Sequence, residues 1–132
     1  MRSFWLGVVA YLLPTFPIAY VWHLVAFAPV YRELAMYRDD VIVPFGLASM
    51  LIQGMAFSWV YPRAFPDRKN AVLGSGLLYG LGLAALSWSF TTLAVAAKNV
   101  MTSVPTYLAL ETGFTLLQFA IVGPLIALAH RR

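Results

Sequence analysis

Two ionisable residues, His23 and Glu111, lie inside long stretches of sequence that carry almost no other charge. A carboxylate and an imidazole can exchange a proton, so these residue types could support proton transfer. Inside a bilayer an ionisable group costs roughly 2.5–3.5 kcal/mol at the centre of a helix, and it is therefore a functional candidate by default. For Glu111 a functional role and a structural hydrogen bond both remain open.

The depth of the two residues follows from the ends of their apolar stretches. The first stretch ends near Ala28, and the last begins near Thr106. At 1.5 Å per helical residue, His23 and Glu111 lie about 7 and about 8 Å inside the same membrane boundary. We therefore expect a hydrogen bond between them, which Lys98, at the end of the third stretch, could join.

Two glutamines, Gln53 and Gln118, are expected near the middle of the membrane. Glu111, Thr115 and Gln118 follow a spacing of four and three residues, so they line one face of a helix. That face must point inward, toward Gln53 and His23, because an amide facing lipid leaves hydrogen-bonding groups without partners. The alternatives are a polar path from the outer surface and interhelical hydrogen bonds of about 0.6 kcal/mol each. For the glutamines we expect interhelical bonds.

Four stretches with little or no charge must position these residues. A helix of about 20 apolar residues spans the roughly 30 Å hydrocarbon core of a bilayer. We predict transmembrane helices over residues 4–28, 41–61, 71–97 and 106–129. The 132 residues are 61% hydrophobic and 11% charged, and the connectors are short. We therefore expect one all-α membrane domain, residues 1–132, folded as an up-down-up-down four-helix bundle.

Basic residues are distributed unevenly between the two expected sides. The N-terminus, the second connector and the C-terminus carry Arg2, Arg63, Arg68, Lys69, Arg131 and Arg132. The opposite side carries Arg32, Arg38 and Lys98, together with Glu33, Asp39 and Asp40. The positive-inside rule then predicts that both termini are cytoplasmic. Because the basic residues lie at helix ends, the net charge of +4 indicates contact with lipid headgroups and no nucleic-acid partner.

Glycines indicate where the helices could pack. Helices in lipid associate through close contact of small residues. The third span has Gly76 and Gly80 on one stripe, and the second has Gly46 and Gly54 on a comparable one. We expect these two spans to form a close-packed antiparallel hairpin. The alternative is that the glycines of the third span face a second subunit.

Pro14 and Pro17 lie near the middle of the first span. Each removes a backbone hydrogen bond and crowds the preceding turn, so we expect a kink there. A broken helix can open a transport cavity. No charge lies beside these prolines, which favours a role in shaping the bundle.

Other kinds of chemistry lack the residues that they need. The absence of cysteine excludes metal sites with thiolate ligands. His23 is the one histidine inside the expected spans, so two histidines of one chain cannot hold a haem there. No Gly-x-Ser-x-Gly, His-Glu-x-x-His or P-loop pattern occurs. We expect no enzymatic activity, no cofactor and no metal.

The stretches TFPIAYVWHLVAFAPVYRELAMY and PFGLASMLIQGMAFSWVYPR, with Glu111 and Gln118 later in the chain, resemble a family of small bacterial four-span membrane proteins of unknown function. The resemblance implies the fold and a bacterial inner membrane, and it carries no mechanism. The chain does not resemble the small multidrug exporters, whose essential glutamate lies in the first span. It also lacks the Gly-rich and Arg motifs of the four-span fluoride channels.

Two functions follow from these observations. The first is a non-catalytic small subunit or assembly partner of a larger membrane complex, because few ionisable groups lie inside the spans and the Gly-rich faces suit helix contacts. The second is a small oligomeric transporter or channel for an ion or small molecule, with a proton-titrating site at Glu111 and His23 near the outer side. The expected partners are the lipid bilayer and other membrane subunits or further copies of the chain.

Overall fold

The structure is a computed structural model that describes residues 1–67 and 71–131. Within these ranges every regular element is a helix, so the predicted all-α class is confirmed. Four of the described helices are long and apolar enough to cross a membrane. A multi-pass membrane protein is therefore supported by length and composition.

The four spans are built from both regular and π-helical segments. The first comprises α1 (Arg2–Val21) and η1 (Trp22–Ala26), and the short α2 (Ala28–Glu33) follows it. The second is α3 (Val43–Ala64). The third comprises α4 (Val72–Trp88), η2 (Ser89–Leu93) and α5 (Ala94–Lys98), and the fourth is α6 (Val104–Ala129). Compared with the sequence prediction, the second span is displaced toward the C-terminus, since it starts at Val43 and continues through Pro62.

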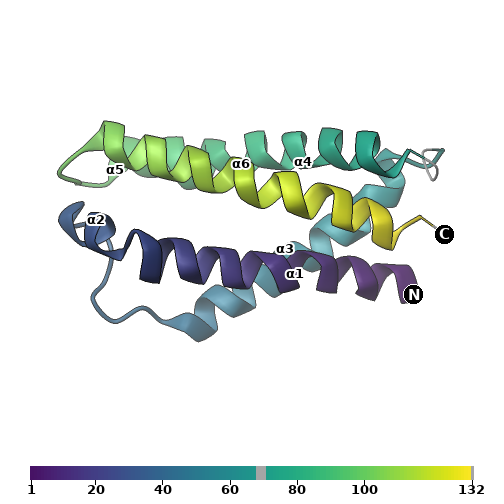
Figure 1. Ribbon diagram of the computed structural model, residues 1–132, viewed down its shortest axis with the longest axis horizontal. Helices are drawn as coiled ribbons and strands as arrows, with labels where there is room; N and C mark the ends of the chain where they lie inside the picture. Colours follow the sequence, from purple (N-terminus) through teal and green to yellow (C-terminus); the bar gives the residue numbers. More distant parts are fainter. Residues whose placement is uncertain (68–70, 132) are drawn as a thin grey trace.

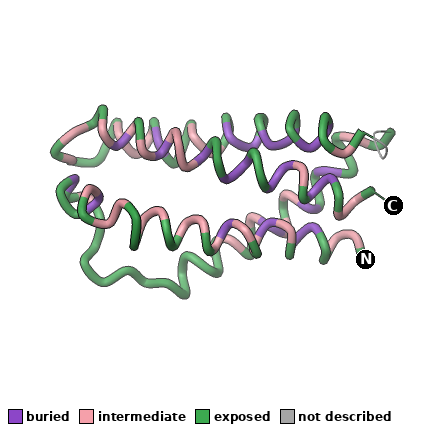
Figure 2. Tube along the Cα trace, viewed as in Figure 1, coloured by how far each residue is buried: buried purple, intermediate pink, exposed green. Residues whose placement is uncertain are grey.

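The two ends of the molecule differ in what they contain. Both chain termini lie at one end, which we call the termini end, and α2 and α5 lie at the other, the α2 end (Figure 1). Helix α6 packs along α4 and α1, and α3 packs along α1. Buried positions follow the inner sides of α4, α6 and part of α1, whereas residues 37–49 are exposed throughout (Figure 2).

Gly76 and Gly80 of the third span pack against α6, so the expected hairpin of the second and third spans is wrong. A Cβ atom added at Gly76 would lie 2.5 Å from the Cα atom of Pro124, and one at Gly80 would lie 3.2 Å from the carbonyl carbon of Phe119. Gly123 of α6 supplies the matching small residue at this crossing. The two backbones can approach because glycines lie on both sides.

The glycines of the second span behave differently from each other. Gly54 faces α1, where an added Cβ would lie 3.1 Å from the Tyr11 ring. Gly46 packs against no helix, since an added Cβ would meet nothing within 4 Å. Helices α3 and α4 meet at the termini end, where the Tyr61 hydroxyl lies 2.8 Å from Oγ of Ser75.

The backbone of the first span departs from α-helical geometry at η1. Helix α1 continues through Pro14 and Pro17, and the kink expected there stays a prediction. The π-helix begins later, at Trp22, and it contains His23. Because π-helical turns are frequent at functional sites, η1 directs attention to the α2 end.

Candidate functional site

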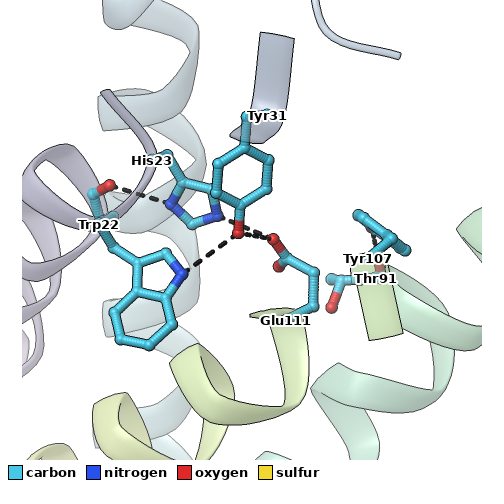
Figure 3. A network of polar contacts seen from close by, with 7 residues as sticks. Trp22, His23, Tyr31, Thr91, Tyr107 and Glu111 are labelled. Carbon is cyan, nitrogen blue, oxygen red and sulfur yellow. Dashed lines mark hydrogen bonds and ion pairs between the residues drawn. The ribbon is translucent and has the colours of Figure 1, made fainter. Parts of the chain in front are cut away.

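His23 and Glu111 are in contact at the α2 end, as their calculated depths suggested. Nε2 of His23 lies 3.0 Å from Oε1 of Glu111 (Figure 3). Glu111 is buried, with 6% of its surface exposed, and the His23 side chain is 20% exposed. The contact joins η1 of the first span to α6 of the fourth.

A tyrosine outside the spans completes this cluster. The Tyr31 hydroxyl of α2 donates a hydrogen bond of 2.5 Å to Oε1 of Glu111 and accepts one of 3.2 Å from the Trp22 indole N–H (Figure 3). Burial and the neighbouring Glu111 raise the pKa of Tyr31 above its usual range. The phenol therefore keeps its proton and remains a donor to the carboxyl group.

The hydrogen bonds of His23 determine how many protons the pair must hold. Nδ1 lies 2.9 Å from the carbonyl oxygen of Ala19, and a carbonyl can only accept, so Nδ1 carries a hydrogen. With no other proton, Nε2 would present a lone pair to the Glu111 carboxylate, and the two acceptors would repel each other. The contact at 3.0 Å therefore needs one further proton, held on Nε2 or on the carboxyl group. The contact is thus either an ion pair of an imidazolium with a carboxylate or a hydrogen bond of a neutral imidazole with a carboxylic acid.

Aromatic side chains hold the imidazole ring in place. The His23 ring centre lies 4.8 Å from that of Tyr31 and 4.6 Å from that of Phe114 on α6. A second bond at this end ties α6 to η2, since the Tyr107 hydroxyl donates to the carbonyl oxygen of Thr91 at 2.8 Å (Figure 3). Both π-helices therefore contribute to the surroundings of Glu111.

One residue that was expected to join the pair, Lys98, takes a different place. Lys98 is exposed at the end of α5, and no ion pair within the described ranges joins it to Glu111. Tyr31 makes the additional contact that we assigned to Lys98. Thr115 is buried one turn farther along α6, with 4% of its surface exposed.

The glutamines meet through a tyrosine of α1. The Tyr11 hydroxyl donates to Oε1 of Gln53 and lies 3.4 Å from Nε2 of Gln118. Gln118 also lies 3.4 Å from Oγ1 of Thr15, and Gln53 donates to Oγ of Ser49 at 2.9 Å. These hydrogen bonds join α1, α3 and α6. The amide groups of both glutamines have partners, which agrees with the expectation of interhelical bonds.

A cavity of about 660 Å³ adjoins the histidine–glutamate pair. His23 and Tyr31 form part of its wall, and Glu111 lies behind them. On the opposite wall, Gly46 and Met50 come from the first half of α3. In Figure 1, α3 diverges from α1 toward this end. His23 and Tyr31 thus separate the Glu111 carboxyl group from the cavity.

A second histidine cluster lies at the termini end. The Ser58 hydroxyl donates to the carbonyl oxygen of Phe4 at 2.7 Å, so its oxygen accepts from Nε2 of His130 at 2.9 Å. Ser58 is fully buried. Burial lowers the pKa of His130 below its ordinary 6.5. This cluster joins the residue after α6 to α3 and α1.

Sequence patterns give little sign of Tyr31, Tyr11 or Ser58. Tyr31 reads as an ordinary interfacial aromatic, because nothing in the sequence shows that α2 folds back over Glu111. Tyr11 lies in an apolar stretch, and only its position level with the two glutamines could have indicated a role. No group of three His, Asp or Glu side chains among the described residues lies close enough to hold a metal ion.

Comparisons with known protein families, with characterised proteins and with solved structures find no match to this chain. The resemblance to a family of small four-span membrane proteins therefore stays an expectation.

Proposed function

We propose that this protein binds and releases a proton at the His23–Glu111 pair as part of moving a small molecule or ion across the membrane. One observation carries the proposal. With Nδ1 of His23 committed to Ala19, the contact of 3.0 Å requires a proton that neither a neutral imidazole nor a carboxylate alone supplies. A structural ion pair of an imidazolium and a carboxylate holds the same proton, so the proposal also depends on what adjoins the pair.

The cavity supports transport over a purely structural role. A structural hydrogen bond gains nothing from an adjoining space, whereas a transporter needs room for its cargo beside the titrating group. When the proton leaves, the lone pair of His23 and the carboxylate of Glu111 repel each other. We expect η1 and α2 to shift in response, because they carry His23 and Tyr31, and this shift would couple proton release to the cavity.

The proposed orientation follows from charge. Four helices alternating in direction, with both termini in the cytoplasm, would leave the more basic connector inside a bacterial inner membrane. The α2 end then faces outward, and the pair titrates from the outer side.

An infrared pH titration tests the proposal. We expect the carboxyl C=O stretch of the wild-type protein in lipid vesicles to change with pH, and the Glu111→Gln variant to lack that component while keeping its fold. The amide retains the shape of the side chain and can donate to Nε2 of His23. A Glu111→Gln protein with the same titration, or one fully active in its native membrane, would contradict the proposal.

A second candidate function is an accessory subunit of a larger complex, and one observation favours it. Gly74 and Gly82 of α4 face away from α6, and a Cβ at either would meet nothing within 4 Å. Such a face suits close contact with a helix of another chain. Purification from the native membrane separates the two candidates, because a subunit co-purifies with other chains and a self-contained transporter forms only copies of itself.

A further inference from the structure

The cavity at the α2 end has walls of two kinds. Phe16 and Leu24 of the first span and Leu47 of α3 supply apolar surface between the helices. Two arginines, Arg32 of α2 and Arg38 of the following segment, lie at its polar rim. Its volume of about 660 Å³ lies within the roughly 300–1,000 Å³ of small-molecule sites. A ligand that fits both walls has an apolar body and a polar head.

The charge at the rim favours an anionic head. Within the described ranges Arg32 has no ion-pair partner. Arg38 pairs with Asp40 at 3.3 Å, but their side chains are 62% and 82% exposed, so this pair is weak and a ligand can replace it. Asp39 is the one acidic residue among those that line the cavity. Arg32 is therefore the guanidinium group of the lining that is open to a ligand, and a guanidinium group binds carboxylate or phosphate with two hydrogen bonds.

We propose that this cavity binds an amphipathic anion with a single acyl chain, taken from the membrane leaflet at the α2 end. The carboxylate or phosphate head meets Arg32 and Arg38, and the chain lies between η1 and the first half of α3. If the protein is a transporter, as proposed above, this anion is its substrate, and only that part of the assignment rests on the proposed function. Binding itself does not require proton exchange.

Gly46 explains how the cavity stays open. It was expected to pack against a helix, but it lies on the cavity wall with nothing within 4 Å of an added Cβ. A larger side chain here would extend into the space without striking backbone. Gly46→Leu is therefore a variant that fills the cavity and leaves the helix contacts intact.

Native mass spectrometry of the purified full chain in a neutral detergent tests the assignment. The probes are dodecyl phosphate and laurate, with dodecyltrimethylammonium as a cation of the same chain length. We expect one bound anion per chain for each anionic probe and no specific binding of the cation. Equal binding of the cation would overturn the choice of an anion.

The variants locate the site. Gly46→Leu should weaken binding of dodecyl phosphate by about tenfold or more, and so should the double variant Arg32→Gln, Arg38→Gln, which loses charge-assisted hydrogen bonds. Gly82→Leu is the matched control, because this glycine also has open space around it but lies on α4, and it should bind as the wild type does. Unchanged binding by Gly46→Leu would overturn the assignment. The titration of Glu111 is measured without any ligand, so the two proposals can fail separately.

Discussion

The protein contains two histidine clusters, one at each end. They differ in whether each contact has both a donor and an acceptor without an added proton. At the termini end, His130 donates to Ser58 and Ser58 donates to Phe4, so every donor meets an acceptor. At the α2 end, His23 and Glu111 meet as two acceptors unless one more proton is present. Both clusters join distant parts of the chain, but only the second would bring two acceptors together without an added proton.

The two clusters also differ in how tightly the surrounding residues enclose them. Ser58 is fully buried, and an added Cβ at Gly7 would lie 2.9 Å from Nε2 of His130, so the first cluster is tightly enclosed. In the second cluster, His23 lies on the π-helix η1 beside a cavity, and Glu111 lies on α6. Both clusters contain buried polar groups, so the adjoining cavity, and not burial, distinguishes the second cluster.

The largest expected effect comes from Glu111→Leu. This change leaves Nε2 of His23 and the Tyr31 hydroxyl without their shared acceptor, and we expect a loss of about 3 kcal/mol in unfolding free energy. Glu111→Gln should lose less than about 1 kcal/mol, because the amide can bond both partners. Unfolding in a mild detergent measures both variants. Equal losses would mean that the cluster does not depend on hydrogen bonding at Glu111.

A smaller effect is expected from Ser58→Ala at the other end. The change leaves the His130 N–H without its acceptor and removes the added bond to the Phe4 carbonyl, at a cost of about 1–3 kcal/mol in unfolding free energy. The infrared titration of Glu111 should be unchanged, since the clusters lie at opposite ends. Ser89→Ala is the control, because the Ser89 hydroxyl bonds a carbonyl of its own span and is exposed, so its loss should stay within about 0.5 kcal/mol. A change in the titration caused by Ser58→Ala would end the distinction between the two clusters.

The helical class and the His23–Glu111 contact could be predicted because both follow from position along the chain. Apolar length predicts a span, and a rise of 1.5 Å per residue predicts which residues share a depth. This arithmetic also brought Gln53 and Gln118 to one level, although Tyr11 stands between them.

The lateral arrangement of the helices could not be predicted in this way. Glycines at the right spacing on both α3 and α4 suggested a hairpin, yet the stripe of α4 faces Gly123 and Pro124 of α6. Spacing shows which face of a helix is small but not which neighbour it meets. For the same reason, a single sequence does not reveal that Tyr31 of α2 contacts Glu111 or that Gly46 lines a cavity. Both features depend on tertiary packing.

The smallest expected effect is the pH dependence contributed by His130. Burial lowers its pKa in the folded protein below the ordinary 6.5, so below about pH 6.5 the unfolded chain binds a proton that the folded chain binds less readily. This contribution to stability is therefore present above pH 6.5 and is lost as the pH falls through that value toward the folded pKa.

The variant that isolates this contribution is His130→Gln. Its amide N–H can still donate to Ser58, but it does not titrate, so the variant should lose less thermal stability between pH 7 and pH 5 than the wild type. The comparison needs only melting temperatures at the two pH values. An identical pH dependence in both proteins would mean that protonation of His130 does not contribute to the pH dependence of stability.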